Sequence, residues 1–442
     1  MKLRIILLII ISTITAALFS QTVWTLQQCV DYAIDHNITV QQLALQRDNQ
    51  TLNLKTSQLS YVPNLNAGLD QNFSFGRAAG SDNVISSQSV ATTSFNVSSS
   101  MPLFTGLRII NQIASDKLNL QAAIEDLNKA KEDLSLQITA YYLNILYYKE
   151  LLAIADEQIT ISSNLVENTK SLVESGKKSE SELYENKAQL ANDQQTRTEA
   201  ANALQLAVLD MCQAINYPEI GNFAVADIET ESLLQKTLSA FMSPEQAYQT
   251  SLSIRPAIKA SEKRIESSKK DLKVAQSSYY PQLDLQAGYS TGYYHSFQLQ
   301  NSAFGQQLGD NSREVVALSL TIPIFNRMAT INRVKQARIA VLNQELELEN
   351  TKQVLLKEIQ TAYYNALAAR DKYVAAGKTA EASQVSFEFE QLKYDGGKST
   401  SFELNNAKTR LEKSLAQEAQ AKFEFIFRTK IFDFYNGSTI NF

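Results

Sequence analysis

The chain has 442 residues, enough for more than one domain by the soft guide of about 150 residues each. It carries 41 lysines and arginines against 46 aspartates and glutamates, for a formal net charge of −5. This mild acidity argues against a nucleic-acid partner, which would require a basic surface. Only 14 glycines and 7 prolines interrupt the chain, so we expect unusually long helices.

The first twenty residues have the pattern of a secretory signal peptide. Lys2 and Arg4 form a basic start, residues 5–11 are aliphatic, and small residues precede a cleavage point before Gln21. The apolar core is short against the roughly 20 residues of a membrane-spanning helix, and no later stretch is apolar enough for one. The sequence therefore predicts an exported protein with a signal peptide at residues 1–20 and no helical membrane anchor.

The remainder of the sequence contains an internal repeat. Residues 101–104 (Met-Pro-Leu-Phe) are echoed by residues 322–325 (Ile-Pro-Ile-Phe), and a turn sequence at Gly176 is echoed at Gly397. Both pairs share one offset of 221 positions (397 − 176). The segment between the two motifs therefore has the same length in both halves, as a duplication requires.

Each repeat is expected to contain the same elements in the same order, beginning with a helix that ends before a proline. The first repeat, 21–242, has strands over 63–76 and 93–104, a helical hairpin over 105–214 and a mixed linker over 215–242. The second repeat, 243–442, has strands over 281–293 and 314–325, a helical hairpin over 326–432 and a tail over 433–442.

The four predicted strands alternate apolar with small polar residues, as Leu65, Ala67 and Leu69 do with the residues between them. Such alternation places one kind of side chain on each face of a strand. Each run has about ten residues, the length of a tilted membrane-spanning strand, and the polar face suits a water-filled lumen. The alternative is a soluble, half-buried sheet. In a membrane, the polar loops 76–92 and 294–313 would lie on the side opposite the helices.

A long helix without proline is predicted after each strand pair, over 105–175 and 326–396. Apolar residues recur there at alternating spacings of four and three, which is typical of a coiled-coil seam. At 1.5 Å per residue, each helix would reach roughly 100 Å. A left-handed glycine, Gly176 or Gly397, is expected to end it, and a serine or threonine would cap the return helix.

The number of strands predicts the oligomer. Four membrane strands in one chain cannot close a barrel, and an open edge in lipid leaves backbone groups unsatisfied. Two copies would give eight strands, whose interior side chains fill, whereas three would give twelve, with room for a channel. We therefore expect a homotrimer in which the long helices extend the pore.

The mature chain resembles the TolC-like outer-membrane factors of tripartite efflux and type I secretion systems. The resemblance rests on the duplication, on Pro-Leu-Phe-Thr-Gly at 102–106 and Pro-Ile-Phe-Asn at 323–326, and on Gly-x-x-Ser/Thr turns at 176–179 and 397–400. The second repeat departs from the usual small or glycine-rich turn at 326–328. The resemblance implies a mainly α fold with β: a trimer with a twelve-stranded outer-membrane barrel, a periplasmic α-helical tunnel and a mixed equatorial belt.

The same resemblance implies the location and the partners. The chain would sit in the bacterial outer membrane, surrounded by its lipid, with most of its length in the periplasm. A periplasmic adaptor, also called a membrane fusion protein, and an inner-membrane transporter of the RND or ABC type would complete the system. The sequence does not distinguish a drug, a metal or a polypeptide as cargo.

The resemblance also assigns a gate to the helix turns, where the family closes its tunnel with acidic residues. The matching positions are Glu182, Glu185, Glu403 and Asn406. Three copies would form rings selective for cations, although Asn406 weakens the second ring. The alternative interpretation of each glutamate is an ordinary solvated charge on the helix surface. The adaptor is expected to dock on Gly176, Lys177, Lys178, Ser179, Gly396, Gly397, Lys398 and Thr400, and Lys177, Lys178, Lys398 or Tyr394 would hold the tip closed.

Other classes of function have less support. The two histidines, His36 and His295, lie in different segments, and we find no metal-ligand spacing, nucleophile elbow or phosphate loop. We therefore expect no enzyme activity, cofactor or metal site. The main alternative is a soluble periplasmic coiled-coil adaptor or scaffold. The two hairpins and the bilayer-length strands disfavour it, and a measurement of whether the protein needs detergent to stay soluble would test it.

Overall fold

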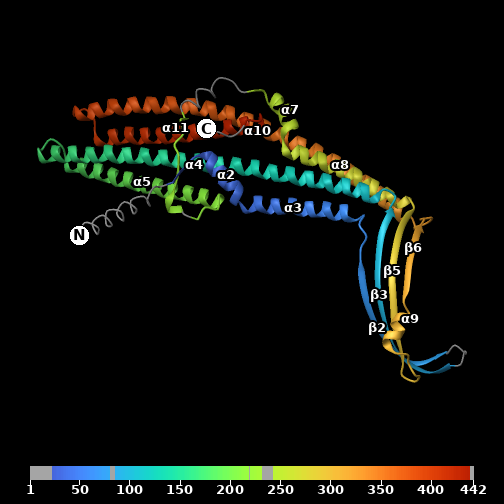
Figure 1. The fold of residues 1–442 in the computed structure, drawn as a ribbon. Coiled ribbons are helices and arrows are strands. Elements are labelled where there is room, and N and C mark those ends of the chain that lie inside the picture. Colours follow the sequence, from blue (N-terminus) through green and yellow to red (C-terminus); the bar gives the residue numbers. More distant parts are fainter. Residues whose placement is uncertain (1–21, 80–84, 219, 231–241, 439–442) are drawn as a thin grey trace, which may run out of the picture. The chain divides into compact units, whose positions relative to one another are not determined.

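The computed structural model describes residues 22–79, 85–218, 220–230 and 242–438 (Figure 1). The predicted signal peptide lies outside these residues. The chain divides into two compact units. The first, here called the helical unit, comprises Met1–Leu45, Glu125–Lys259 and Asn350–Phe442, and the second, the sheet unit, comprises Gln46–Ile124 and Ala260–Glu349.

The sheet unit contains an antiparallel sheet in the order β2-β3-β5-β6. Its strands are β2 (Asn66–Ala79), β3 (Ile85–Phe104), β5 (Gln282–Ser296) and β6 (Arg313–Thr321). Strands from the two repeats meet where β3 pairs with β5. Within the described chain, β2 and β6 each pair on one side, so both leave an open edge.

The strand register puts most of the apolar residues of the four strands on one face. Leu285 lies between Met101 of β3 and Leu318 of β6, and Leu69 pairs with Phe95. Polar residues occupy the other face in the same way, because Asn96 pairs with Gly68 and with Ser290. Alternation within each strand thus becomes a difference between two whole faces of the sheet.

Two strand boundaries differ from the prediction. Most of 76–92, predicted as a loop, is strand, because β2 and β3 stay paired out to Ala79 and Ile85. Serines and threonines in this segment are compatible with a ladder of backbone hydrogen bonds, which the polarity of the sequence concealed. The second loop contains a short helix, α9 (Phe304–Asp310), which lies along β5.

The fourth strand ends at Thr321 rather than at residue 325, and a tight turn leads from there into the long helix. Arg327 and Met328 have positive φ angles of 56° and 65°. Gly106 and Leu107, at the equivalent positions of the first repeat, have angles of 62° and 67°. The departure of the second repeat at 326–328 therefore keeps the same turn, at the cost of left-handed conformations in residues with side chains.

The helices repeat with matching lengths. Both α4 (Arg108–Glu174) and α10 (Ala329–Asp395) have 67 residues, and both α5 (Glu180–Ala214) and α11 (Ser401–Tyr435) have 35. The starts of α4 and α10 differ by 221 positions (329 − 108), the offset seen in the sequence motifs.

The opening helix of each repeat is broken in two. In the first repeat, α2 (Leu26–His36) and α3 (Ile38–Leu59) are separated by Asn37, whose side-chain oxygen accepts the backbone N–H of Thr39 at 2.9 Å. In the second, α7 (Pro244–Ile254) and α8 (Pro256–Gln276) break at Arg255, because the proline that follows disfavours helix there.

The main hydrophobic core lies in the helical unit. Ile138 and Tyr142 of α4, Met211 of α5 and Phe425 of α11 are buried in one cluster. A two-stranded parallel pair, β1 (Thr22–Trp24) with β4 (Phe223–Val225), joins this cluster through Phe223 and Val225. The hydroxyl of Tyr142 donates to the O atom of Ala226, directly after β4, at 2.7 Å. None of the helices in the described part of the chain combines the length and the hydropathy needed to cross a lipid bilayer.

Candidate functional site: the helix turns

The first hairpin turn has the geometry that the sequence predicts. Helix α4 ends at Glu174, and Gly176 follows with φ 73°. The Lys177 N–H donates to Leu172 O at 2.8 Å, and the Gly176 N–H donates to Val173 O at 2.9 Å. These two bonds form a Schellman motif, which satisfies the last carbonyls of the helix.

The second turn repeats this geometry. Gly397 has φ 67°, Lys398 N–H donates to Lys393 O at 2.8 Å, and the Gly397 N–H donates to Tyr394 O at 3.1 Å. A Cβ atom built on Gly176 or Gly397 would meet no atom within 4 Å. Glycine is therefore required by the left-handed backbone and not by lack of space.

The return helices begin with side-chain caps. Ser179 accepts the Glu182 N–H at 3.3 Å, and Thr400 accepts the Glu403 N–H at 3.3 Å. Glu403 completes a capping box, because its carboxylate accepts the Thr400 N–H at 2.9 Å. This backbone bond, together with the hydroxyls of Ser399 and Thr400, lowers the pKa of Glu403 below its usual range. The carboxylate of this predicted gate residue therefore stabilises its own helix end.

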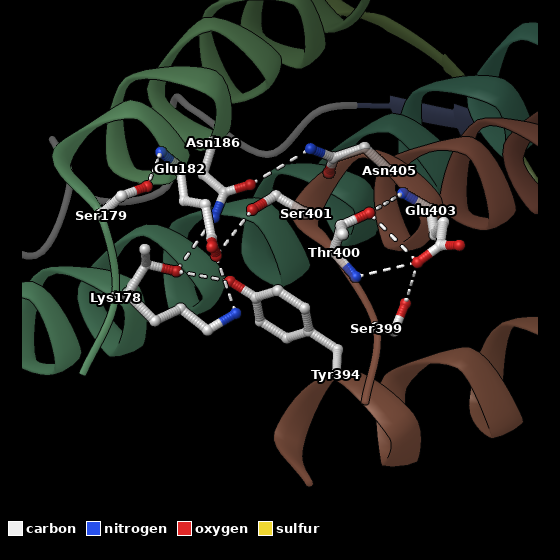
Figure 2. Close-up of polar contacts among 11 residues, drawn as sticks. Lys178, Ser179, Glu182, Asn186, Tyr394, Ser399, Thr400, Ser401, Glu403 and Asn405 are labelled. Atoms are coloured by element: carbon white, nitrogen blue, oxygen red, sulfur yellow. Dashed lines mark hydrogen bonds and ion pairs between the residues drawn. The ribbon is translucent and has the colours of Figure 1, made fainter. Parts of the chain in front are cut away.

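The two hairpins are joined at the tips by Glu182 (Figure 2). Its carboxylate lies 2.8 Å from Lys178 Nζ and accepts the hydroxyl of Ser401 at 3.1 Å. The Lys178 ammonium also lies over the ring of Tyr394, 3.4 Å from its centroid. Lys178 and Glu182 belong to the first hairpin, and Tyr394 and Ser401 belong to the second. One ion pair is thus anchored on both hairpins.

A buried row of hydrogen bonds continues from the tyrosine (Figure 2). The Tyr394 hydroxyl is 3.1 Å from Thr169 Oγ1, which accepts Asn186 Nδ2 at 2.9 Å. Asn186 Oδ1 in turn accepts Asn405 Nδ2 at 3.1 Å. Tyr394 is only 3% exposed and Asn186 1%. We call the seven residues of these two paragraphs, together with the cap residue Ser179, the tip network: Thr169, Lys178, Ser179, Glu182, Asn186, Tyr394, Ser401 and Asn405.

The electrostatics of the tip network favour a charged lysine. Burial opposes the charge on Lys178, but its bonds to Glu182 and Tyr394 outweigh burial and raise its pKa. Burial likewise opposes ionisation of Tyr394, but hydrogen bonds from Thr169, Lys178, Ser401 and Asn186 outweigh it and lower the pKa of the hydroxyl. Both shifts have the sign expected for a cation held beside an electron-rich ring and hydroxyl.

The structure brings only some of the predicted site residues together. It brings Glu182, Lys178 and Tyr394 together, while Glu185 and Asn406 are exposed on their helices. Thr169, Asn186, Ser401 and Asn405 were not among the site residues predicted from the sequence. A signal existed for one of them, because Thr169 continues the four-and-three spacing of the α4 seam as a polar residue.

A second polar cluster lies in the same helical unit. Lys408 of α11 contacts the Asp193 carboxylate of α5 and the Ser162 hydroxyl of α4. Lys408 is 1% exposed and Asp193 3%. Breaking such a buried pair by removing one partner costs about 3–5 kcal/mol. Partly exposed pairs such as Lys178 with Glu182 typically contribute only about 0.2–1 kcal/mol.

The fold and the repeated turns define a class of protein with known members. The model of the outer membrane efflux protein family matches residues 29–216 and 247–424. The chain belongs to this family, and it is therefore a protein of the bacterial outer membrane with a large periplasmic part.

Individual relatives agree with the family assignment. The chain is 21% identical over 311 residues to the outer membrane efflux protein BepC of Brucella suis, covering 70% of this chain and 64% of that protein. It is 23% identical over 241 residues to the outer membrane protein TolC of Escherichia coli, covering 54% of this chain and 47% of that protein. The match thus spans less than two thirds of these curated relatives.

Solved structures share the fold. CusC superposes with a TM-score of 0.77 at 16% identity, covering 95% of this chain and 94% of that chain. The CmeC outer membrane channel of Campylobacter jejuni gives a TM-score of 0.75 at 16% identity, covering 93% of this chain and 85% of that chain. The matched proteins are efflux proteins and channels rather than enzymes. Among the described residues, no group of three or more potential ligands is arranged to hold a metal ion.

Proposed function

We propose that this protein is the exit duct of an efflux or secretion system, a passive conduit from periplasm to exterior. The observation that carries the proposal is the two-faced sheet with open edges. Its apolar face exposes Leu69, Val316 and Leu318 at 64%, 78% and 66%. A soluble sheet would cover such residues, whereas a strand in contact with lipid presents them outward.

Aromatic residues at both ends of the sheet support the same proposal. Phe104 and Phe325 are exposed near one end, and Phe75 and Phe297 stack with ring centroids 6.2 Å apart near the other. Membrane strands carry such aromatic girdles at the two water–lipid boundaries. The apolar band between them fits a bilayer, and the face lined by Asn96, Ser290 and their neighbours fits a water-filled lumen.

The open edges of β2 and β6 support a homotrimer. Their unpaired backbone groups require partners in lipid, and the same strands of two further copies would supply them in a twelve-stranded barrel. The mass of the detergent-purified complex tests this proposal. We expect three chains, and a monomer or dimer would contradict the barrel.

We further propose that the tips of the hairpins are the gate and the docking place for a periplasmic adaptor. The tip network ties the two hairpins together next to both turns, so an adaptor that binds there can compete for its contacts. Glu182, Glu185, Glu403 and Asn406 would line the same constriction in a trimer. An inner-membrane transporter of the RND or ABC type would deliver the cargo.

The topology has its own experiment. Epitope tags in the hairpin loops of the sheet unit, within 76–92 or 294–313, should be accessible on intact cells. A tag at Lys177 should be accessible only after the outer membrane is permeabilised. The reverse pattern of labelling would overturn the proposed orientation.

A further inference from the structure

A buried ionic cluster joins both helical hairpins at some distance from the turns. The Lys408 ammonium contacts the Asp193 carboxylate and the Ser162 hydroxyl, and this hydroxyl donates to the same carboxylate oxygen. Gln189 Nε2 donates to the other carboxylate oxygen at 2.8 Å. Each partner of Lys408 belongs to the first hairpin, through α4 and α5, whereas Lys408 belongs to the second.

The surroundings of the cluster are apolar. Leu404, Ala407 and Leu411 on α11 are buried in one hydrophobic cluster, against which Ile161 and Leu165 of α4 pack. A lysine buried this deeply is rare without a charged partner. If α11 slid or rotated against α4 and α5, the ammonium would enter this apolar layer and the Asp193 carboxylate would be left unpaired.

The ion pair of the tip network is more accessible to water than the ion pair of this cluster. The side chains of Lys178 and Glu182 are 12% and 29% exposed, against 1% and 2% for Lys408 and Asp193. Lys178 lies four residues after the end of α4, whereas Ser162 lies well inside this helix. The ion pair of the tip network is therefore partly exposed and lies next to the turns, whereas the ion pair of the cluster is buried and lies deeper along the helices.

We propose that the Lys408–Asp193–Ser162 cluster is a fixed fulcrum, which keeps the two hairpins in register while the tip network opens. This inference rests on the proposed gate at the tips. Segments between the cluster and the turns separate on opening, and segments beyond the cluster stay packed. The cluster thereby limits how far an opening movement travels along the helices.

Hydrogen–deuterium exchange on the full detergent-purified protein tests the fulcrum. The variant Lys178→Met/Tyr394→Phe removes the ion pair with Glu182, the cation–π contact and the hydroxyl bond to Thr169, and it leaves the cluster intact. We expect roughly tenfold faster exchange in 165–175 and 390–402, because about one or two hydrogen bonds are lost there. Exchange in 150–160 and 412–422, beyond the cluster, should not change.

The same tip variant is then measured without the cluster. Lys408→Met leaves Asp193 buried and unpaired, so we expect a lower thermal midpoint. Lys408→Met/Asp193→Leu replaces both charges by apolar side chains and should restore most of the thermal midpoint. In this double background, the tip variant should accelerate exchange in 150–160 and 412–422 as well. The double background carries the test if Lys408→Met alone does not fold.

Three results would overturn the fulcrum. The first is that the tip variant accelerates exchange in 150–160 and 412–422 although the cluster is intact. The second is that exchange in these segments stays unchanged in the double background. The third is that the tip variant accelerates exchange in no segment at all. A different result would contradict the proposed gate. If the tip variant opens the tips in exchange but leaves the single-channel conductance unchanged, the tips are not the gate, while the fulcrum stands.

Discussion

Lys178 and Tyr394 lie on different helical hairpins, and the ammonium of Lys178 is 3.4 Å from the centroid of the Tyr394 ring. The same ammonium pairs with Glu182 at 2.8 Å, and the Tyr394 hydroxyl contacts Thr169 at 3.1 Å. The cation is thus shared between a carboxylate of its own hairpin and a ring of the other. Separating the hairpins at the tips removes both the cation–π contact and the hydroxyl bond, which makes this pair a sensitive point for opening.

Replacing Tyr394 by phenylalanine should weaken the closed tip. Phenylalanine keeps the ring below Lys178 but removes the hydroxyl, which leaves buried Thr169 with one partner fewer. Losing such a bond costs about 0.5–1.5 kcal/mol, and more if a buried group stays unsatisfied. We expect a higher single-channel conductance, or more frequent openings, in planar bilayers.

Tyr364→Phe is the matched control, because this tyrosine lies on the same helix and is 66% exposed. It should behave as the wild type. An unchanged conductance for Tyr394→Phe would show that the hydroxyl does not hold the tip closed.

The acidic positions should influence ion selectivity. A charge about 10 Å from a permeating ion in water contributes about 0.4 kcal/mol, and a trimer carries three copies of each charge. Glu182→Gln/Glu403→Gln should therefore lower the preference for cations severalfold in reversal-potential measurements. Glu381→Gln, an exposed glutamate of α10 away from the turns, provides the control. Equal selectivity in both variants would place the selective rings elsewhere.

The turn glycines should be more sensitive to substitution than a glycine inside a helix. Gly176→Ala and Gly397→Ala force a side chain into a left-handed conformation, at a cost of about 1–2 kcal/mol each. Gly377 lies inside α10 without a positive φ, and its Cβ would meet Glu418 Oε1 at 3.4 Å. Gly377→Ala should therefore stabilise the helix, by about 0.5–1 kcal/mol. Thermal unfolding at one fixed scan rate should show opposite shifts, and shifts of equal sign would contradict the turn assignment.

The cap of α11 should weaken in acid. The Thr400 N–H and its neighbours lower the pKa of Glu403, so the unfolded chain binds a proton there more readily than the folded chain does. The contribution of the Glu403 carboxylate to stability is present above about pH 4.3, the ordinary pKa of glutamate. It is lost as the pH falls through the lower pKa that this carboxylate has in the folded chain. Glu403→Gln has no charge to lose.

Pepsin cleavage beside the exposed Phe402 provides the measurement. At about pH 5, Glu403→Gln should be cut faster than the wild type, and the difference should shrink as the pH falls below about 4.3. A constant ratio of the two rates over this range would show that the carboxylate does not stabilise the cap.

The sequence by itself determined the repeating elements and their ends. The offset of 221 positions became helices of equal length, and Gly176 and Gly397 ended them in the predicted motif. The alternation in the strands became the two faces of the sheet. These features are local: they depend on helix and strand periods, on left-handed glycine and on capping side chains, all of which a short segment carries in its own residues.

The tertiary structure decided which side chains meet. Glu182, predicted as part of a cation-selective ring, pairs with Lys178 and reaches Ser401 because the second hairpin lies against the first. Lys408, one of many lysines on a helix, is buried for the same reason, 215 positions from its partner Asp193. Arg327 and Met328 adopt positive φ angles although neither is glycine. The packing of the surrounding fold compensates for the conformational free energy that these left-handed residues cost. Contacts between residues so distant in sequence depend on how whole helices pack, and no periodicity within either helix contains that information.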